Sequence, residues 1–173
     1  LNVGVVAHYW GKGSEFSRGN PDRFPLEEDD RNYLAAAKKH GRPVVGYIQG
    51  ICWDTDTESF AERDGFEHTV RNFYDQRVVW NLGRGDKRHV AGIAYPGEAW
   101  TEVLGDAVEK MAKTGFSAAY LDSFNHAGTY LNFNPIYRNE CGGGNQYIKD
   151  NQELFRDVCE RARDVNPEFC FTA

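Results

Sequence analysis

The sequence has no long apolar segment and no excess of positive charge. No run approaches the roughly 20 apolar residues that a membrane helix needs, and no signal-peptide pattern opens the chain. Its 173 residues include 20 Lys and Arg against 26 Asp and Glu, for a net charge of -6. Nucleic-acid affinity depends largely on a basic surface. We therefore expect a soluble protein that binds neither a membrane nor a nucleic acid, while its compartment stays unknown.

Motifs that define several classes of site are also missing. The 4 cysteines show no Cys-x-x-Cys pair and the 5 histidines share no metal-ligand spacing, so we expect neither a metal nor a cofactor. There is no Gly-x-Ser-x-Gly elbow of a serine hydrolase. A calcium loop starting at Asp54 fails because Ser59 stands where glycine is required. The cysteines, including Cys159 and Cys170, are interpreted as buried free thiols.

The chain is rich in material for a hydrophobic core. It contains 11 Phe, 9 Tyr and 4 Trp, which excludes a disordered segment, and its length favours one domain. Apolar periodicity predicts helices and strands. Buried strands are predicted at 3–10, 44–50, 116–122 and 169–173, helices at 26–40, 98–114 and 146–165, a less regular helix at 58–74, and two short strands at 77–82 and 88–95.

Buried strands that alternate with amphipathic helices indicate an α/β fold with a parallel sheet. A doubly wound sheet would place a Gly-rich phosphate turn after a strand, and none stands there. A complete (β/α)8 barrel typically needs about 250 residues. We therefore expect about half of a TIM-type barrel: four parallel neighbouring strands with crossover helices, and with helices 98–114 and 146–165 on the outer face. Both ends lie in apolar runs, so residues 1–173 are interpreted as a single partial domain truncated at both ends.

In parallel α/β folds the working residues gather at the carboxyl ends of the strands. The side chains there are rich in aromatic rings and carboxylates and poor in Lys and Arg. Such a lining suits a neutral sugar, because rings pack on its C–H faces while polar groups hold its hydroxyls. The candidate residues are His8, Trp10, Tyr47, Trp53, Asp54, Tyr120, Asp122, Asn125 and His126.

Asp122 is the leading catalytic candidate, because it closes a strand that is otherwise apolar. Hydrolysis of a glycosidic bond needs two carboxyl groups that flank the anomeric carbon. The alternative is that Asp122 caps the following turn, and Asp54 is equally open to interpretation as a polar loop residue. A Schiff-base lyase would need a lysine at a strand end, and none of the four strands supplies one.

Several short motifs occur in an order that resembles a known family. They are the strand 44–50 followed by Trp53-Asp54, then Ala94-Tyr95-Pro96 with Trp100, then Ala119-Tyr120-Leu121-Asp122, and finally Gly142-Gly143-Gly144. Together they resemble a bacterial family of uncharacterised glycoside-hydrolase-like (β/α)-barrel proteins, distantly similar to the α-galactosidase (melibiase) clan. The resemblance covers most of residues 3–173.

This resemblance implies a function and assigns a role to Asp122. In the melibiase clan the nucleophile is an Asp at the end of the fourth barrel strand and the acid/base follows the sixth. If the four strands are barrel strands two to five, Asp122 is that nucleophile and the acid/base lies beyond Ala173. The expected function is a retaining glycoside hydrolase acting on O-glycosidic bonds of a neutral sugar, and the alternative is a non-catalytic carbohydrate-binding barrel. The expected partners are a carbohydrate and either the remainder of the barrel or a second copy.

Overall fold

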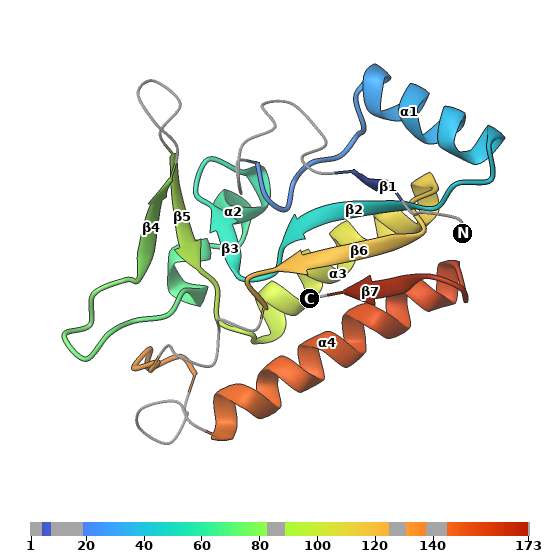
Figure 1. The fold of residues 1–173 in the computed structure, drawn as a ribbon. Helices are drawn as coiled ribbons and strands as arrows, with labels where there is room; N and C mark the ends of the chain where they lie inside the picture. The colour runs from blue at the N-terminus through green and yellow to red at the C-terminus, as the bar shows by residue number, and fades with distance from the viewer. Residues whose placement is uncertain (1–4, 8–18, 83–88, 125–130, 138–144, 173) are drawn as a thin grey trace.

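The structure is a computed structural model that describes residues 5–7, 19–82, 89–124, 131–137 and 145–172. Helices and strands alternate along most of the chain (Figure 1). In order, the elements are β1 (Val5–Ala7), α1 (Glu28–Lys39), β2 (Val44–Gln49), β3 (Cys52–Asp54), α2 (Glu58–Glu62), the 3-10 helix η1 (Gly65–His68), β4 (Val79–Leu82), β5 (His89–Ile93), α3 (Glu98–Thr114), β6 (Ala118–Asp122), α4 (Asn145–Val165) and β7 (Cys170–Thr172).

A parallel sheet forms the centre of the molecule. Its strands lie in the order β1-β2-β6-β7, and every neighbouring pair is parallel. This confirms the prediction that the four apolar runs are parallel neighbours, and β2 and β6 are slightly shorter than their runs. The pairing of β2 with β6 places Tyr47 opposite Tyr120 and Gln49 opposite Asp122. The two strands therefore end together, with their last side chains side by side.

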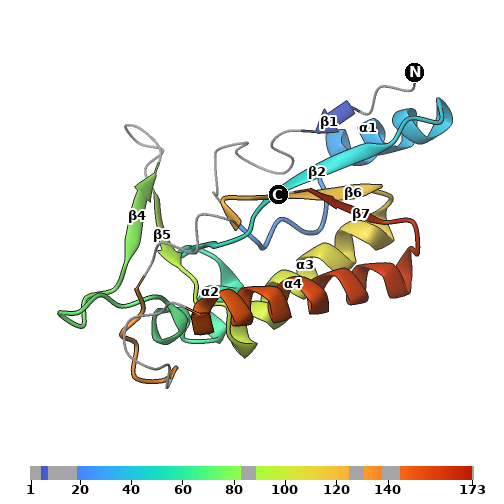
Figure 2. The ribbon, with the colours of Figure 1, turned by 60° about the horizontal axis from the view of Figure 1, so that its bottom comes forward.

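Helices α3 and α4 lie side by side on one face of this sheet, as predicted (Figure 2). Helix α3 buries a continuous stripe that includes Trp100, Leu104, Val108 and Met111, and its predicted bounds are confirmed. It ends at Gly115, whose φ of 105° is left-handed and suits glycine. Apolar residues of both helices and of β2 and β6 form one hydrophobic cluster, which fixes the helices against the sheet.

A second sheet occupies the chain between β2 and β6. Its strands run antiparallel in the order β3-β5-β4, and Figure 1 shows it beyond the ends towards which β2 and β6 point. The predicted pair of short strands corresponds to β4 and β5. Strand β3 was not predicted, because it has only three residues and follows Gly50 and Ile51 directly after β2. The insertion therefore flanks the edge where the strand-end residues lie.

The predicted helix over 58–74 is wrong beyond its first turns. Helix α2 ends at Glu62, and Asp64 adopts a left-handed φ of 48° before η1 begins. A Cβ on Gly65 would lie 2.4 Å from the Phe60 ring, so the chain folds back closely on itself there. From Thr69 onward the backbone is extended and forms a bridge with Ala94. Tertiary packing thus replaces the helix that the apolar spacing suggested.

One of the three thiols that the structure describes differs from the prediction, and Cys141 lies outside the described residues. Cys52 and Cys159 are buried as predicted, whereas Cys170 is exposed. The reason is that Cys170 lies on β7, which is an edge strand of the parallel sheet with an alternating pattern of exposure. In the part of the chain that the structure describes, no helix is long and apolar enough to cross a membrane.

Candidate active site

Four side chains of β2 and β6 share the face of the sheet opposite α3. Side chains alternate between the two faces of a strand, and a Cβ on Gly46 would point into Met111 of α3. Tyr47 and Gln49 on β2 therefore point away from the helix, next to Tyr120 and Asp122 in the pairing register. The rings of Tyr47 and Tyr120 lie 5.8 Å apart. This arrangement gathers two hydroxyls, an amide and a carboxylate at the carboxyl ends of two strands.

The Asp122 carboxylate accepts hydrogen bonds on both of its oxygens. Oδ2 accepts from the Tyr47 hydroxyl at 2.7 Å and from Gln49 Nε2 at 2.9 Å. Oδ1 accepts from the Tyr120 hydroxyl at 3.2 Å and from the Ser123 backbone N–H at 2.8 Å. Ser123 has a left-handed φ of 59°, and this turn brings its N–H back to the preceding side chain. A carboxylate has about four lone-pair positions, so these donors match its full accepting capacity.

Gln49 organises this cluster from a fully buried position. Its Nε2 donates to the Tyr47 hydroxyl at 2.7 Å as well as to Asp122. Asn20 fixes the Gln49 backbone: Asn20 Oδ1 accepts from Gln49 N at 3.0 Å, and Asn20 Nδ2 donates to Gln49 O at 3.1 Å. Gln49 and Asn20 are not among the candidate residues predicted from the sequence. The signal for Gln49 was available, because it lies two residues after Tyr47 and therefore on the same strand face.

Two other predicted sugar contacts are placed elsewhere. Trp53 is fully buried, with its ring 5.2 Å from Phe60 and 5.3 Å from Trp100, and its indole N–H donates to Ser59 Oγ. No part of this ring is open to a sugar. Its burial follows from β3, which turns the side chain into the core instead of leaving it on a loop.

Asp54 is only 1% exposed and holds the local backbone. Its Oδ2 accepts from the Gly19 N–H and its Oδ1 from the Asp56 N–H, at 2.6 and 3.0 Å. These contacts correspond to the alternative interpretation of Asp54 as a loop residue. The remaining candidates His8, Trp10, Asn125 and His126, and the glycines 142–144, lie outside the described residues.

A buried thiol lies close enough to Asp122 to be affected by its charge. Burial and, second, the negative charge of Asp122 raise the pKa of the Cys52 thiol far above its usual range. Cys52 therefore stays protonated and is not a nucleophile. Among the described residues, no group of three or more His, Cys, Asp or Glu side chains could hold a metal ion.

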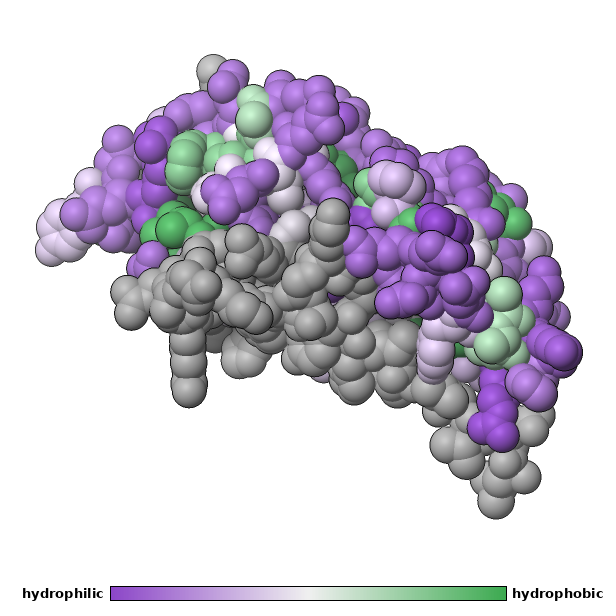
Figure 3. Space-filling model, turned by 90° about the horizontal axis from the view of Figure 1, so that it is seen from above, coloured by the Kyte–Doolittle hydropathy of each residue, from purple (hydrophilic) through white to green (hydrophobic). Residues whose placement is uncertain are grey.

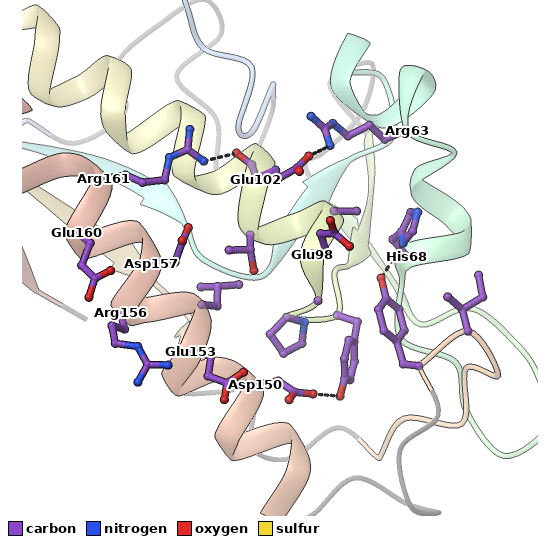
Figure 4. Close-up of a pocket in the computed structure, with 18 residues that line it drawn as sticks. Arg63, His68, Glu98, Glu102, Asp150, Glu153, Arg156, Asp157, Glu160 and Arg161 are labelled. Atoms are coloured by element: carbon purple, nitrogen blue, oxygen red, sulfur yellow. Dashed lines mark hydrogen bonds and ion pairs between the residues drawn. The ribbon is translucent and has the colours of Figure 1, made fainter. Parts of the chain in front are cut away.

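A separate groove of about 1120 Å³ lies between the first turns of α3, the middle of α4 and the insertion (Figure 4). Tyr95 and Tyr137 stack in it with centroids 4.1 Å apart; Tyr95 donates to Asp150, and the Tyr137 hydroxyl lies 2.6 Å from His68 Nδ1. The Arg63–Glu102 ion pair closes one side. Asp122 does not line this groove, so the strand-end cluster is a distinct site.

The fold is similar to part of several solved glycoside hydrolases. The α-N-acetylgalactosaminidase of Bifidobacterium bifidum is similar at a TM-score of 0.68 and 13% identity, over 91% of this chain and 25% of that one. The α-galactosidase of Thermus thermophilus in complex with stachyose matches at a TM-score of 0.54 and 17% identity, over 86% of this chain and 29% of that one. An α-amylase from Lactobacillus plantarum matches at a TM-score of 0.54 and 12% identity, over 89% of this chain and 30% of that one.

The chain therefore spans between a quarter and a third of the length of these enzymes. No curated protein matches it. The whole chain, residues 1–173, matches the family described as a domain of unknown function, DUF6259, and belongs to that family.

Proposed function

We propose that this chain is the nucleophile-bearing part of a retaining glycoside hydrolase that acts on O-glycosidic bonds of a neutral sugar. Residues 1–173 form about half of a TIM-type barrel in this proposal, and Asp122 attacks the anomeric carbon. The observation that carries it is the position of Asp122: a carboxylate at the carboxyl end of a parallel strand, held by neighbouring side chains of β2 and β6. The glycosidase fold of the structural neighbours supports the same function.

The hydrogen bonds to Asp122 must leave one carboxylate oxygen free if Asp122 is the nucleophile. A nucleophilic oxygen needs a lone pair directed at the anomeric carbon, and the four donors match the capacity of the carboxylate. The Tyr120 hydroxyl makes the longest of these bonds, and Tyr120 is half-buried, whereas Tyr47 and Gln49 are buried. We infer that Tyr120 turns from Oδ1 to a sugar hydroxyl when substrate binds. Its release would free Oδ1 for attack.

The retaining reaction also needs an acid/base carboxyl about 5–5.5 Å from the nucleophile. The resemblance to the melibiase clan assigns this group to a later barrel strand, beyond Ala173. In the proposal it protonates the leaving oxygen while Asp122 forms the glycosyl-enzyme bond. It then removes a proton from the water that hydrolyses this bond.

One observation favours the second candidate, a carbohydrate-binding barrel without catalysis. The Asp122 carboxylate already accepts four hydrogen bonds from the protein. If it keeps all four when a sugar is bound, it has no lone pair for the anomeric carbon and orders the side chains of the binding site instead of acting as a nucleophile. The two functions differ in the fate of Asp122, so its substitution distinguishes them.

The test is Asp122→Asn in the intact protein, with an activated aryl glycoside as substrate. Asparagine keeps the size of the side chain but removes the nucleophilic charge. We expect turnover to fall by about a thousandfold or more, a loss of several kcal/mol of transition-state stabilisation. Sugar binding should change little. The melting temperature should fall modestly, because the asparagine NH2 group cannot accept the hydrogen bonds that one oxygen of the Asp122 carboxylate accepts.

Asp54→Asn provides the matched control, because Asp54 also lies at a strand end but, among the described residues, its carboxylate accepts from the backbone N–H groups of Gly19 and Asp56. Turnover of Asp122→Asn within about tenfold of wild type would remove Asp122 from the reaction. Sugar binding by a wild-type protein that turns over no glycoside would favour the binding barrel instead.

A further inference from the structure

Two aromatic side chains stand out on the surface of the insertion. Phe73 is 76% exposed and Tyr74 is 79% exposed, more than the other exposed large hydrophobic residues of the described chain. They occupy a hairpin loop between Arg71 and Arg77, which are paired by a bridge. The surface seen from above is largely hydrophilic, with separate hydrophobic patches (Figure 3). Two highly exposed rings at a loop tip are therefore unusual on this surface and indicate a candidate binding site.

The loop is held rigidly although its rings are exposed. The Asp75 N–H donates to Asn72 O at 3.0 Å and closes a turn, and the Asn72 N–H donates to Gln76 O at 2.9 Å. The Asn72 side chain accepts from the Tyr74 and Gln76 N–H groups at 2.9 and 3.0 Å. Asp75 takes the left-handed φ of 59° that this turn requires. Aromatic side chains on a fixed backbone lose little entropy on binding a ligand.

The base of the loop is anchored to the rest of the insertion. The Arg71 guanidinium, largely buried, forms ion pairs with Asp75 at 2.9 Å and Glu67 at 2.8 Å. Phe73 packs edge-on against Phe133 at 5.5 Å and against Tyr74 at 5.6 Å. These contacts hold the two rings nearly perpendicular to each other. The loop thus presents two ring faces in a fixed orientation.

The size and surroundings of this pair favour a sugar over a protein as the ligand. One fully buried Phe or Tyr removes about 150–250 Å² from water, so two rings offer well under the roughly 800 Å² per partner of a stable protein interface. The same loop carries the amides of Asn72 and Gln76, which hydrogen-bond to each other, and the carboxylate of Asp75, which pairs with Arg71. Such groups match sugar hydroxyls. The insertion that carries the loop lies beyond the ends of β2 and β6, where Asp122 lies.

We propose that Phe73 and Tyr74 form a platform that stacks on pyranose rings of a neutral polysaccharide, away from Asp122. The choice of ligand rests on the proposed glycosidase function and extends it: the substrate is a polymer that contacts both the insertion and the strand-end site. The platform holds the chain by ring stacking, with no covalent step.

Affinity electrophoresis of the intact protein through gels that contain galactomannan, arabinogalactan or dextran tests this proposal. At least one polysaccharide should retard the wild type. Phe73→Ala/Tyr74→Ala should weaken this binding at least tenfold. Tyr33→Ala, which removes a 41% exposed tyrosine from α1 at the opposite end of the molecule, is the matched control and should leave it unchanged. Tyr74→Ala alone tests the proposal if the double variant fails to fold.

Binding does not require hydrolysis, so the two proposals fail separately. Asp122→Asn should still be retarded. Hydrolysis of an aryl glycoside without retardation by any polysaccharide would overturn the platform and leave the proposed function intact. If the double variant is retarded as strongly as the wild type, the platform is also overturned. Self-association that the double variant abolishes, without retardation in any gel, would assign the two rings to a contact between copies.

Discussion

Buried side chains of the neighbouring strand β2 orient the Asp122 carboxylate, in addition to its own strand. The Tyr47 hydroxyl accepts from Gln49 Nε2 and donates to Asp122 Oδ2. Because the amide occupies its lone pair, this hydroxyl is set as a donor to the carboxylate. Tyr47 is 2% exposed, so removal of its oxygen deprives Gln49 Nε2 and Asp122 Oδ2 of one hydrogen bond each at a position away from water.

Tyr47→Phe is therefore expected to destabilise the fold and to lower activity. Removing one buried hydrogen-bonding group costs about 1–3 kcal/mol, measured by urea unfolding. Turnover should fall by about 10–100-fold, the effect of a misplaced nucleophile. Tyr120→Phe is the matched control: its hydroxyl bonds the same carboxylate from a half-buried position, and its stability should stay within about 1 kcal/mol of wild type. Equal unfolding free energies for both variants would contradict this account of Tyr47.

The sequence predicted the position of Asp122 but not its contacts. An Asp after an apolar strand is recognisable from the pattern alone, and so are Tyr47 and Tyr120 as strand-end residues. The hydrogen bonds depend on the register that pairs Gln49 with Asp122, and register between strands far apart in sequence is set by tertiary packing. Trp53 was misplaced for a related reason: its burial depends on β3, whose partner β5 lies far along the chain.

At the level of elements, the packing of α3 on the sheet depends on the small residue at position 46. A Cβ on Gly46 would lie 2.3 Å from Met111 Cε and 2.9 Å from the Phe116 ring. Met111 is fully buried and Phe116 is 2% exposed. The helix can lie this close to β2 only because no side chain projects there.

Gly46→Ala should therefore destabilise the protein by about 1–3 kcal/mol, the usual effect of overpacking a core. Gly105→Ala adds the same methyl group to α3, where it would meet the guanidinium of Arg161 at 2.4 Å. That guanidinium ends a long side chain that is 27% exposed, so it can move away at the cost of its ion pairs with Asp106 and Glu109, and such partly exposed pairs contribute little. Alanine favours a helix over glycine by about 1 kcal/mol. Urea unfolding should therefore find Gly105→Ala near wild type. A Gly46→Ala protein as stable as wild type would contradict the close packing.

The elements that were predicted correctly are those whose local signals agree. Helix α3 combines an unbroken apolar stripe with Gly115 at its end, and its bounds match the prediction. Residues 58–74 have apolar spacing but also Gly65, where close contact with Phe60 and the left-handed Asp64 divert the chain. Spacing alone therefore cannot separate a helix from a compact series of turns.

The parallel sheet as a whole has two outer strands, β1 and β7, that each pair with one neighbour within the described sheet. Cys170 and Thr172 on β7 are exposed. Outer strands present backbone groups that can pair with another chain. We propose that the remainder of a barrel, or a second copy, covers these strands.

The 173-residue chain studied in isolation should accordingly self-associate as its concentration rises, as measured by sedimentation velocity. Thr172→Lys adds a charge to an outer strand and should weaken this association. A monomer at every concentration, with one cooperative unfolding transition, would contradict the proposal.

The insertion between β2 and β6 also has a consequence for the order of folding. The contact between Val44 and Ser117 joins residues 73 positions apart, so this pairing closes a long loop and is intrinsically slow. The β4–β5 hairpin inside that loop joins neighbouring segments and can form early. Once the antiparallel sheet is formed, less flexible chain remains between β2 and β6, so the loop that their pairing closes is shorter. Docking of β6 on β2, which assembles the Asp122 cluster, is then the late step in which the chain acquires its candidate active site.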